Sequence, residues 1–180
     1  MFERVCEDIT AKSGLQAGRP GFWSYLQTMA ERGTLAVMVY RFGRRSRQVR
    51  VPLLKPFLMA IYYVLFYLVQ MFTGISIQAH TDIGRRFVVR NFSGIFVLAE
   101  RIGSDCTVCE GVTVGNIRGK GRLPIIGDRV YLEPGCKVLG AVTIGDDVVI
   151  RANSLILSDV PNQSLAIGNP ARILPLTGAG

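Results

Sequence analysis

The side chains that could do chemistry are few and unevenly placed along the sequence. His80 is the only histidine in the 180 residues. Cys106 and Cys109 form a C-x-x-C pair, but neither a second pair nor a nearby histidine completes the ligand set of a zinc site, so we expect no bound metal. The segment Gly115–Pro124 (GNIRGKGRLP) concentrates three basic residues among glycines, a composition suited to binding phosphate groups.

The composition is that of a folded, cationic chain. Hydrophobic residues make up 49% and charged residues 19%, which argues against disorder and fits one domain, or a domain plus an N-terminal arm. The net charge of +8 favours an anionic partner: nucleic acid, an acidic membrane surface or a phosphorylated cofactor. Nucleic acid is disfavoured because the basic residues have no interleaved aromatic platform. The N-terminus (MFERVCEDIT) has no apolar signal region, so we expect a cytosolic protein with free thiols.

A repeat with a period of six residues runs through the C-terminal part of the chain. This period fits neither an α-helix nor a simple strand, whereas eighteen residues would make one three-sided coil of a solenoid, with glycines at its tight corners. The alternative, a β-sandwich with fortuitous spacing, explains the repeat less well. The aliphatic residues that we expect to point inward are Ile77, Ile83, Val89, Ile95, Ile102, Val108, Val114, Ile126, Leu132, Val138, Ile144, Ile150 and Ile156.

A second set of mostly small residues follows four positions after these aliphatic residues. Cys106 and Cys136 belong to this set, so we expect them to fill space inside the solenoid, with Cys109 at a turn position. Phe87 is the bulky exception. The twelve-residue step after Val114 contains the basic segment, whose glycines and proline predict a loop that leaves the solenoid.

The N-terminal residues predict helices. A helix is expected over Phe22–Arg45, with Gly33 separating two pieces, and the cationic run Arg44–Arg50 follows it. Next come fourteen apolar residues, Pro56–Val69, which are short for a membrane span of about twenty. Three interpretations remain open: a helix buried against the solenoid or between subunits, a helix lying on an anionic membrane with the arginines at the headgroups, or a transmembrane helix.

These patterns divide the chain into three parts. Residues 1–74 form a helical arm with a candidate membrane surface, residues 75–160 form the solenoid with a loop at 115–125, and residues 161–180 form a C-terminal tail.

Four stretches resemble the hexapeptide-repeat acyltransferases, in the serine O-acetyltransferase branch. They are TGISIQAHTDIGRRF, GVTVGN, PIIGDRVYLEPGCKVLGAVTIGDDVVIRANSLILSDVP and AIGNPARIL, within about Thr73 to Leu174. Inside that branch the chain is most similar to exopolysaccharide O-acetyltransferases, such as the colanic acid enzymes. The resemblance implies a mainly β chain with a left-handed parallel β-helix and an N-terminal α-helical arm. It also implies a homotrimer, with acetyl-CoA as co-substrate between adjacent subunits.

The resemblance also implies cofactor contacts. The loop opens at Gly115, and Lys120 and Arg122 are placed to meet the CoA phosphates; a solvated basic surface is the alternative. Ala141 and Ala152 fall at small positions that the pantetheine arm passes, or they serve packing alone. Arg172, in NPAR, matches the end of the family pattern that is associated with CoA.

The chain departs from the family at the catalytic base. The family histidine falls on Asn91 and the glycine after it on Phe92, while a second histidine of the serine enzymes falls on Leu123. Asn cannot act as a base, because its side chain only donates and accepts hydrogen bonds. Glu110 is a candidate substitute base, although it fits an exposed coil residue too, and His80 fits a surface corner.

Two functions therefore stay open. One is an acetyl-CoA-dependent O-acetyltransferase acting on a saccharide or lipid-linked sugar in exopolysaccharide biosynthesis, at the cytoplasmic face of the membrane. The other is a catalytically inactive acetyltransferase homologue that acts as a trimeric, membrane-associated scaffold or partner protein, for instance for a polysaccharide-synthesis enzyme. Serine is disfavoured as acceptor because both histidines are missing.

Overall fold

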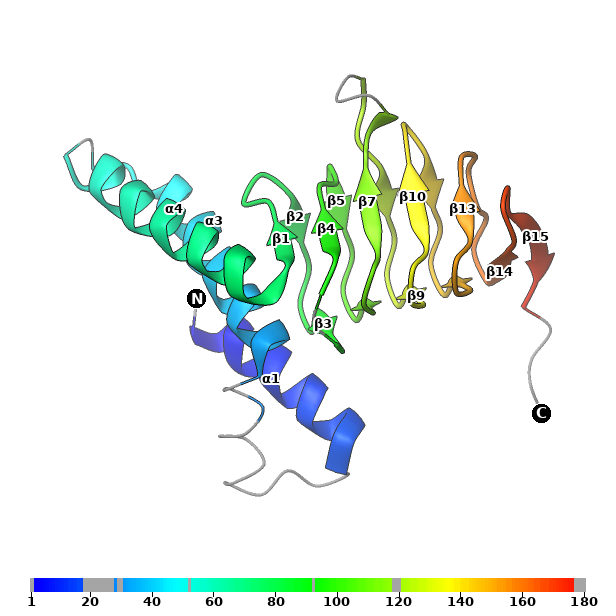
Figure 1. Cartoon of the computed structure of the whole chain (residues 1–180), viewed down its shortest axis with the longest axis horizontal. Helices are drawn as coiled ribbons and strands as arrows, with labels where there is room; N and C mark the ends of the chain where they lie inside the picture. The colour runs from blue at the N-terminus through cyan, green and yellow to red at the C-terminus, as the bar shows by residue number, and fades with distance from the viewer. Residues whose placement is uncertain are drawn as a thin grey trace.

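The computed structural model describes residues 2–17, 28, 31–51, 53–91, 93–117 and 121–176. Three helices, α1 (Phe2–Ala17), α3 (Arg32–Gln48) and α4 (Leu54–Thr73), gather at one end of a β-solenoid, and the C-terminus lies at the other end (Figure 1). The fold is therefore the predicted left-handed parallel β-helix with an N-terminal α-helical arm.

Three sheets form the walls of the solenoid, and within each wall a strand pairs in parallel with the strand one coil earlier. An antiparallel pair, β14 with β15, closes the C-terminal end. The first wall holds β1 (Ile75–Ile77), β4 (Ile95–Val97), β7 (Thr113–Gly115), β10 (Lys137–Leu139) and β13 (Leu155–Ile156). The second wall holds β2 (Asp82–Ile83), β5 (Arg101–Ile102), β8 (Ile125–Ile126) and β11 (Thr143–Ile144). The third wall holds β3 (Val88–Val89), β6 (Thr107–Val108), β9 (Tyr131–Leu132), β12 (Val149–Ile150), β14 (Ser164–Ile167) and β15 (Arg172–Pro175).

The repeated aliphatic residues form the core, as predicted. Ile83, Val108, Ile126 and Ile144 are all buried in one hydrophobic cluster that runs along the solenoid. Each coil covers the apolar side chains of the next, so the stability of this core comes from neighbouring coils.

One corner departs from the predicted spacing. Ile95 is buried in the core as expected, but it pairs with Ile75, whereas Ile77 pairs with Val97, so the residue in register with Ile77 comes two positions later than the repeat predicted. The corner between β3 and β4 is correspondingly longer. Its bend is made by Ser93 and Gly94, whose φ angles are 97° and 65°. The longer corner matters because it carries Asn91.

The buried cysteines occupy the interior positions that the repeat predicted. Cys106 is 1% exposed and Cys136 is 0% exposed. Burial raises the pKa of Cys106 to about 11 and that of Cys136 to about 12, so both thiols stay protonated near neutral pH. A protonated buried thiol is a poor nucleophile and a poor metal ligand, which agrees with a packing role.

Helix α3 closes the N-terminal end of the solenoid. Its residues Ala36, Val37 and Tyr40 join the core cluster, and the Tyr40 hydroxyl donates to the Thr81 carbonyl at 2.9 Å. The expected break comes two residues before Gly33: Glu31 is extended and α3 begins at Arg32, so Gly33 lies in the first turn of α3. Gly33 serves close packing instead: a Cβ there would lie 2.8 Å from the Val89 carbonyl oxygen. Most of the predicted helix before Glu31 lies outside the described residues.

Helix α4 is longer than the apolar run that predicted it. It ends at Gly74, which takes the left-handed conformation (φ 67°) that caps helices. Only Tyr62, Phe66 and Thr73 of the helix are buried. The interpretation that this helix is buried against the chain's own solenoid is therefore wrong. By length and composition alone, α4 is the one helix in the described part of the chain that could cross a membrane.

The solenoid also continues past residue 160, where the tail was expected to begin. Strand β14 pairs in parallel with β12 and adds a further strand to the third wall. Arg172 lies in β15, which turns back along β14. Ala166 of β14 belongs to the core cluster, and Ala171, just before β15, packs against it.

Charged pairs join neighbouring coils at one corner of the solenoid. The Arg86 guanidinium binds the Asp105 carboxylate one coil later, and Arg129 binds Asp147 in the same way. Each arginine holds the pKa of its carboxylate partner below the ordinary value of 3.8. The folded state therefore gains stability above about pH 4, and it loses that gain as the pH falls through the lowered pKa.

Removing one of these carboxylates should weaken the acid dependence of stability. We expect Asp105→Asn to cost under about 1 kcal/mol at pH 7, because the pair is largely exposed to solvent and screened. The cost should be smaller at pH 3, below the ordinary pKa of 3.8, because the stability from the lowered pKa of Asp105 is lost as the pH falls through it. Urea unfolding at the two pH values measures this. Glu100→Gln, an exposed carboxylate without an ion pair in the described ranges, should show no such difference.

Candidate functional site

One corner of the solenoid aligns the residues that the sequence proposed for catalysis. The register pairs Val89 with Val108, Val108 with Leu132, and Leu132 with Ile150. The residues two positions after these form a column along the corner that follows the third wall. The column consists of Asn91, Glu110, Pro134 and Ala152.

Asn91 and Glu110 are in direct contact. The Asn91 side-chain amide donates a hydrogen bond from Nδ2 to Glu110 Oε2 at 2.7 Å. Asn91 is exposed and Glu110 is partly exposed, so a ligand can reach both. Of the two, only the Glu110 carboxylate can take up a proton, because an amide has no basic lone pair near neutral pH. The position that the resemblance assigns to the base therefore lies within one hydrogen bond of a titratable group.

A second cluster lies one position earlier along the same corner. Arg90 Nη1 donates to the Tyr131 hydroxyl at 2.8 Å, and Cys109 Sγ lies 3.6 Å from the same oxygen. Burial raises the pKa of Tyr131 and of Cys109, and the bond to Tyr131 raises the pKa of Arg90. The cluster is thus a neutral phenol and a neutral thiol beside a guanidinium that stays charged.

Sequence reasoning missed this cluster. Arg90 and Tyr131 are 41 residues apart, and no motif joins them. The repeat register alone could have placed Cys109 beside Arg90, since their strands pair. Arg90 is anchored in this way next to Asn91, which limits the movement of the corner.

Farther along the corner, the Glu133 carboxylate accepts hydrogen bonds from Ala152 and from its neighbour Arg151. Its Oε1 accepts from Arg151 Nη1 at 2.9 Å, and its Oε2 accepts from the Ala152 backbone N–H at 2.9 Å. The Ala152 amide is therefore already bonded, and this residue offers a small exposed side chain rather than a free donor.

Gly115 and Ala141, two of the cofactor residues proposed from the sequence, lie at a different corner, whereas Ala152 shares the corner of Asn91. Gly115 ends β7, its carbonyl accepts from the Gly140 N–H at 2.9 Å, and Ala141 follows directly. This corner joins the first wall to the second, whereas the Asn91 corner joins the third wall to the first. Within one chain the two half-sites therefore do not meet.

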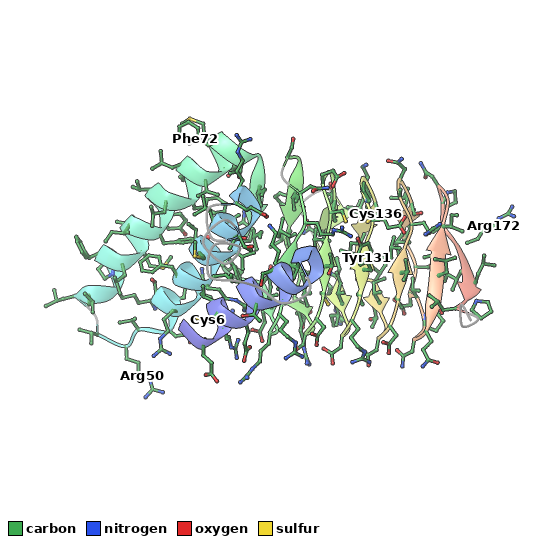
Figure 2. All side chains as sticks on the ribbon, turned by 90° about the horizontal axis from the view of Figure 1, so that it is seen from below. Cys6, Arg50, Phe72, Tyr131, Cys136 and Arg172 are labelled. Carbon is green, nitrogen blue, oxygen red and sulfur yellow. The ribbon has the colours of Figure 1, made fainter. Side chains whose placement is uncertain are left out.

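The remaining candidates fall at scattered positions. Arg122 is exposed near the end of the loop, and Lys120 lies outside the described residues. Figure 2 shows Arg172 exposed at the C-terminal end, away from Tyr131 along the solenoid. His80 is an exposed corner residue, as predicted; partial burial and then the nearby Arg47 and Arg44 lower its pKa.

Comparison with known proteins agrees with this architecture. The family described as bacterial transferase hexapeptide (six repeats) matches residues 124–158. A serine acetyltransferase of Helicobacter pylori is 42% identical over 112 residues, which are 59% of this chain and 64% of that protein. Soybean serine acetyltransferase complexed with serine superimposes with a TM-score of 0.80 at 26% identity, covering 96% of this chain and 68% of that one. A serine acetyltransferase in complex with CoA gives 0.80 at 24% identity, over 96% and 69%.

The comparisons support two features of this chain: the hexapeptide repeat and a β-helix like that of the acyltransferases. The chain spans less than two thirds of the length of the Helicobacter relative. All three relatives are serine acetyltransferases, so they do not support the narrower resemblance to exopolysaccharide enzymes.

Proposed function

We propose that this β-helix is an acetyl-CoA-dependent O-acetyltransferase in which Glu110 acts as the base in place of the family histidine. The hydrogen bond between Asn91 and Glu110 carries the proposal, because it brings a carboxylate to the position of the missing histidine. The hexapeptide repeat and the likeness to a serine acetyltransferase that binds CoA support acetyl-CoA as the co-substrate.

The chemistry requires one base and no metal. The acceptor hydroxyl oxygen attacks the thioester carbonyl carbon while the Glu110 carboxylate takes the hydroxyl proton. The tetrahedral intermediate then collapses: the C–S bond breaks, the acetyl ester is released, and the CoA sulfur receives the proton from Glu110. Asn91 donates to Glu110 Oε2 and so leaves Oε1 for the acceptor hydroxyl.

A complete site needs a second copy of the chain. The Asn91 corner and the Gly115 corner lie on different edges of the solenoid, so a neighbouring copy must bring one edge to the other. We therefore place acetyl-CoA between adjacent subunits of a homotrimer. Lys120 and Arg122 would meet its phosphates, Gly115, Ala141 and Ala152 would flank the pantetheine arm, and Arg172 would approach the CoA end.

The proposed acceptor is a hydroxyl of a saccharide or a lipid-linked sugar, in exopolysaccharide biosynthesis. The relatives act on serine by name, and this remains the competing acceptor. Two departures favour the sugar: Asn91 and Leu123 stand where the resemblance places the two histidines of the serine enzymes. A site built around a different base suits a different acceptor.

One observation favours a second function, a non-catalytic scaffold. Asn91 cannot take a proton, and its neighbour Arg90 is held in its charged form by Tyr131. A chain that keeps the trimeric solenoid without turnover could hold a polysaccharide-synthesis enzyme in place.

Acetyl-CoA binding and CoA release separate these functions. For the purified full chain we expect saturable acetyl-CoA binding by calorimetry. A thiol reporter should then show release of CoA that a saccharide acceptor stimulates more strongly than serine does. Absence of acetyl-CoA binding would exclude the acetyltransferase. Binding without turnover, together with turnover in Asn91→His, would identify the scaffold, and stronger stimulation by serine would correct the acceptor.

A further inference from the structure

Helix α4 presents a large apolar surface that nothing in the described chain covers. No charged residue occurs between Pro56 and Thr73. The exposed side chains include Phe57, Val64, Tyr67, Leu68, Met71 and Phe72, of which Phe72 is 72% exposed and Met71 69%. Contiguous apolar surface of this kind marks a site of interaction with a protein or a membrane.

The exposed apolar surface of α4 is wider than that of a helix that packs on a protein. The buried residues Tyr62, Phe66 and Thr73 fall at helical spacing on one stripe, and Tyr62 contacts α3 at Gly43, where an added Cβ would overlap its ring. The rest of the circumference remains apolar and open. A helix that packs on a protein usually carries polar residues on its far side, whereas α4 has almost none. A lipid surface accepts a wide apolar arc of this kind.

Basic residues gather where α3 gives way to α4. Arg50 and Lys55 form no ion pair within the described ranges, whereas Arg41 and Arg44 are paired with Asp8 and Asp82. The sequence contains no Asp or Glu from Arg32 to Thr73. Figure 2 shows Arg50 at the end of the helical arm far from Phe72. The charge of this arm is therefore complementary to anionic headgroups.

The helix is placed to lie on a membrane rather than to cross it. Its twenty residues span about 30 Å, enough to cross. However, α3 packs beside it, and the last turns of α3 contain four arginines, Arg41, Arg44, Arg45 and Arg47, which would enter the bilayer with it. Strand β1 also starts directly after Gly74, which keeps the solenoid against the end of α4.

We propose that α4 seats this protein on an anionic lipid surface, with its open side chains in the acyl boundary and Arg50 and Lys55 at the headgroups. The C-terminal end of α4 lies beside Ser93 and Gly94 of the Asn91 corner, but the lipid contact uses neither Asn91 nor Glu110, so the inference does not depend on the proposed function. The cytoplasmic leaflet carries such anionic lipids. If both proposals hold, the acyl transfer takes place at the membrane surface, where a lipid-linked acceptor would be found.

Flotation of the full chain with phosphatidylcholine vesicles, with and without phosphatidylglycerol, tests the proposal. The wild type should float with the anionic vesicles, and high salt should weaken this binding. Arg50→Gln with Lys55→Gln should lower the partition coefficient about 30-fold, from about 1 kcal/mol for each basic residue. Val64→Glu with Tyr67→Glu should abolish flotation. Leu174→Glu, at an exposed apolar position of β15, is the matched control and should float like the wild type.

Several results would overturn the inference. Wild-type protein that ignores anionic vesicles, or that floats equally well with neutral ones, would do so, as would a Val64→Glu, Tyr67→Glu variant that still floats. Light scattering without lipid gives a further outcome: if this variant converts a larger assembly into a smaller one, the face belongs to a second copy of the chain. The Arg50, Lys55 variant changes only exposed side chains, so it keeps the test valid if the glutamate variant fails to fold.

Discussion

Glu110→Gln should lower the turnover of acetyl-CoA with its acceptor by about 10²- to 10⁴-fold, the usual contribution of a positioned general base. The glutamine keeps the size of the side chain and can still accept the hydrogen bond from Asn91 Nδ2, but it cannot take a proton. The affinity for acetyl-CoA should change little, because Gly115, Ala141 and Arg122 lie at the other corner and only Ala152 of the proposed cofactor contacts shares the corner of Glu110. Steady-state CoA release, with calorimetry of acetyl-CoA, measures both quantities.

Two further variants sharpen this prediction. Glu3→Gln removes an exposed carboxylate of α1, outside both corners of the proposed site, and should leave turnover unchanged. Adding Asn91→His to Glu110→Gln should restore part of the rate, since an imidazole then stands where the family has its base. Full activity of Glu110→Gln alone would show that this carboxylate is not the base.

Arg41→Ala should lower the free energy of unfolding by about 3–5 kcal/mol, the usual cost of breaking one side of a buried ion pair. Arg41 Nε donates to Asp8 Oδ2 at 3.0 Å, and its Nη1 donates to the Ile83 carbonyl at 2.7 Å. Asp8 Oδ1 also accepts the Phe87 backbone N–H at 2.9 Å. Without the guanidinium, the buried Asp8 carboxylate would keep only the Phe87 N–H, the Ile83 carbonyl would lose the Arg41 donor, and α1 would lose its buried ion pair with α3.

Urea unfolding, with amide exchange along α1, measures this effect. Arg44→Ala is the matched control on the same helix. Its pair with Asp82 is partly exposed, so its loss should cost no more than about 1 kcal/mol. Similar costs for the two substitutions would contradict the role assigned to the buried pair.

Much of the fold follows from residue spacing alone. Inward aliphatic residues at a period of six can be buried together only if the backbone winds into a three-walled coil, and the structure places Ile83, Val108, Ile126 and Ile144 in one core. The fourteen-residue apolar run likewise predicted a helix, although its ends at Leu54 and Thr73 depended on capping. These features are local, because each follows from residues that are close in sequence.

The site and the arm depended on the tertiary structure. The contact of Asn91 with Glu110 joins residues 19 positions apart, and it depends on the longer corner after β3, which breaks the period. The bond of Arg41 to Asp8 joins two helices through residues 33 positions apart. No pattern in the sequence pairs these two residues. Spacing determines which side chains point inward, because burial repeats with every coil. The contacts between exposed side chains depend instead on the tertiary structure. They form only when coils of unequal length pack together with the helices that close the solenoid.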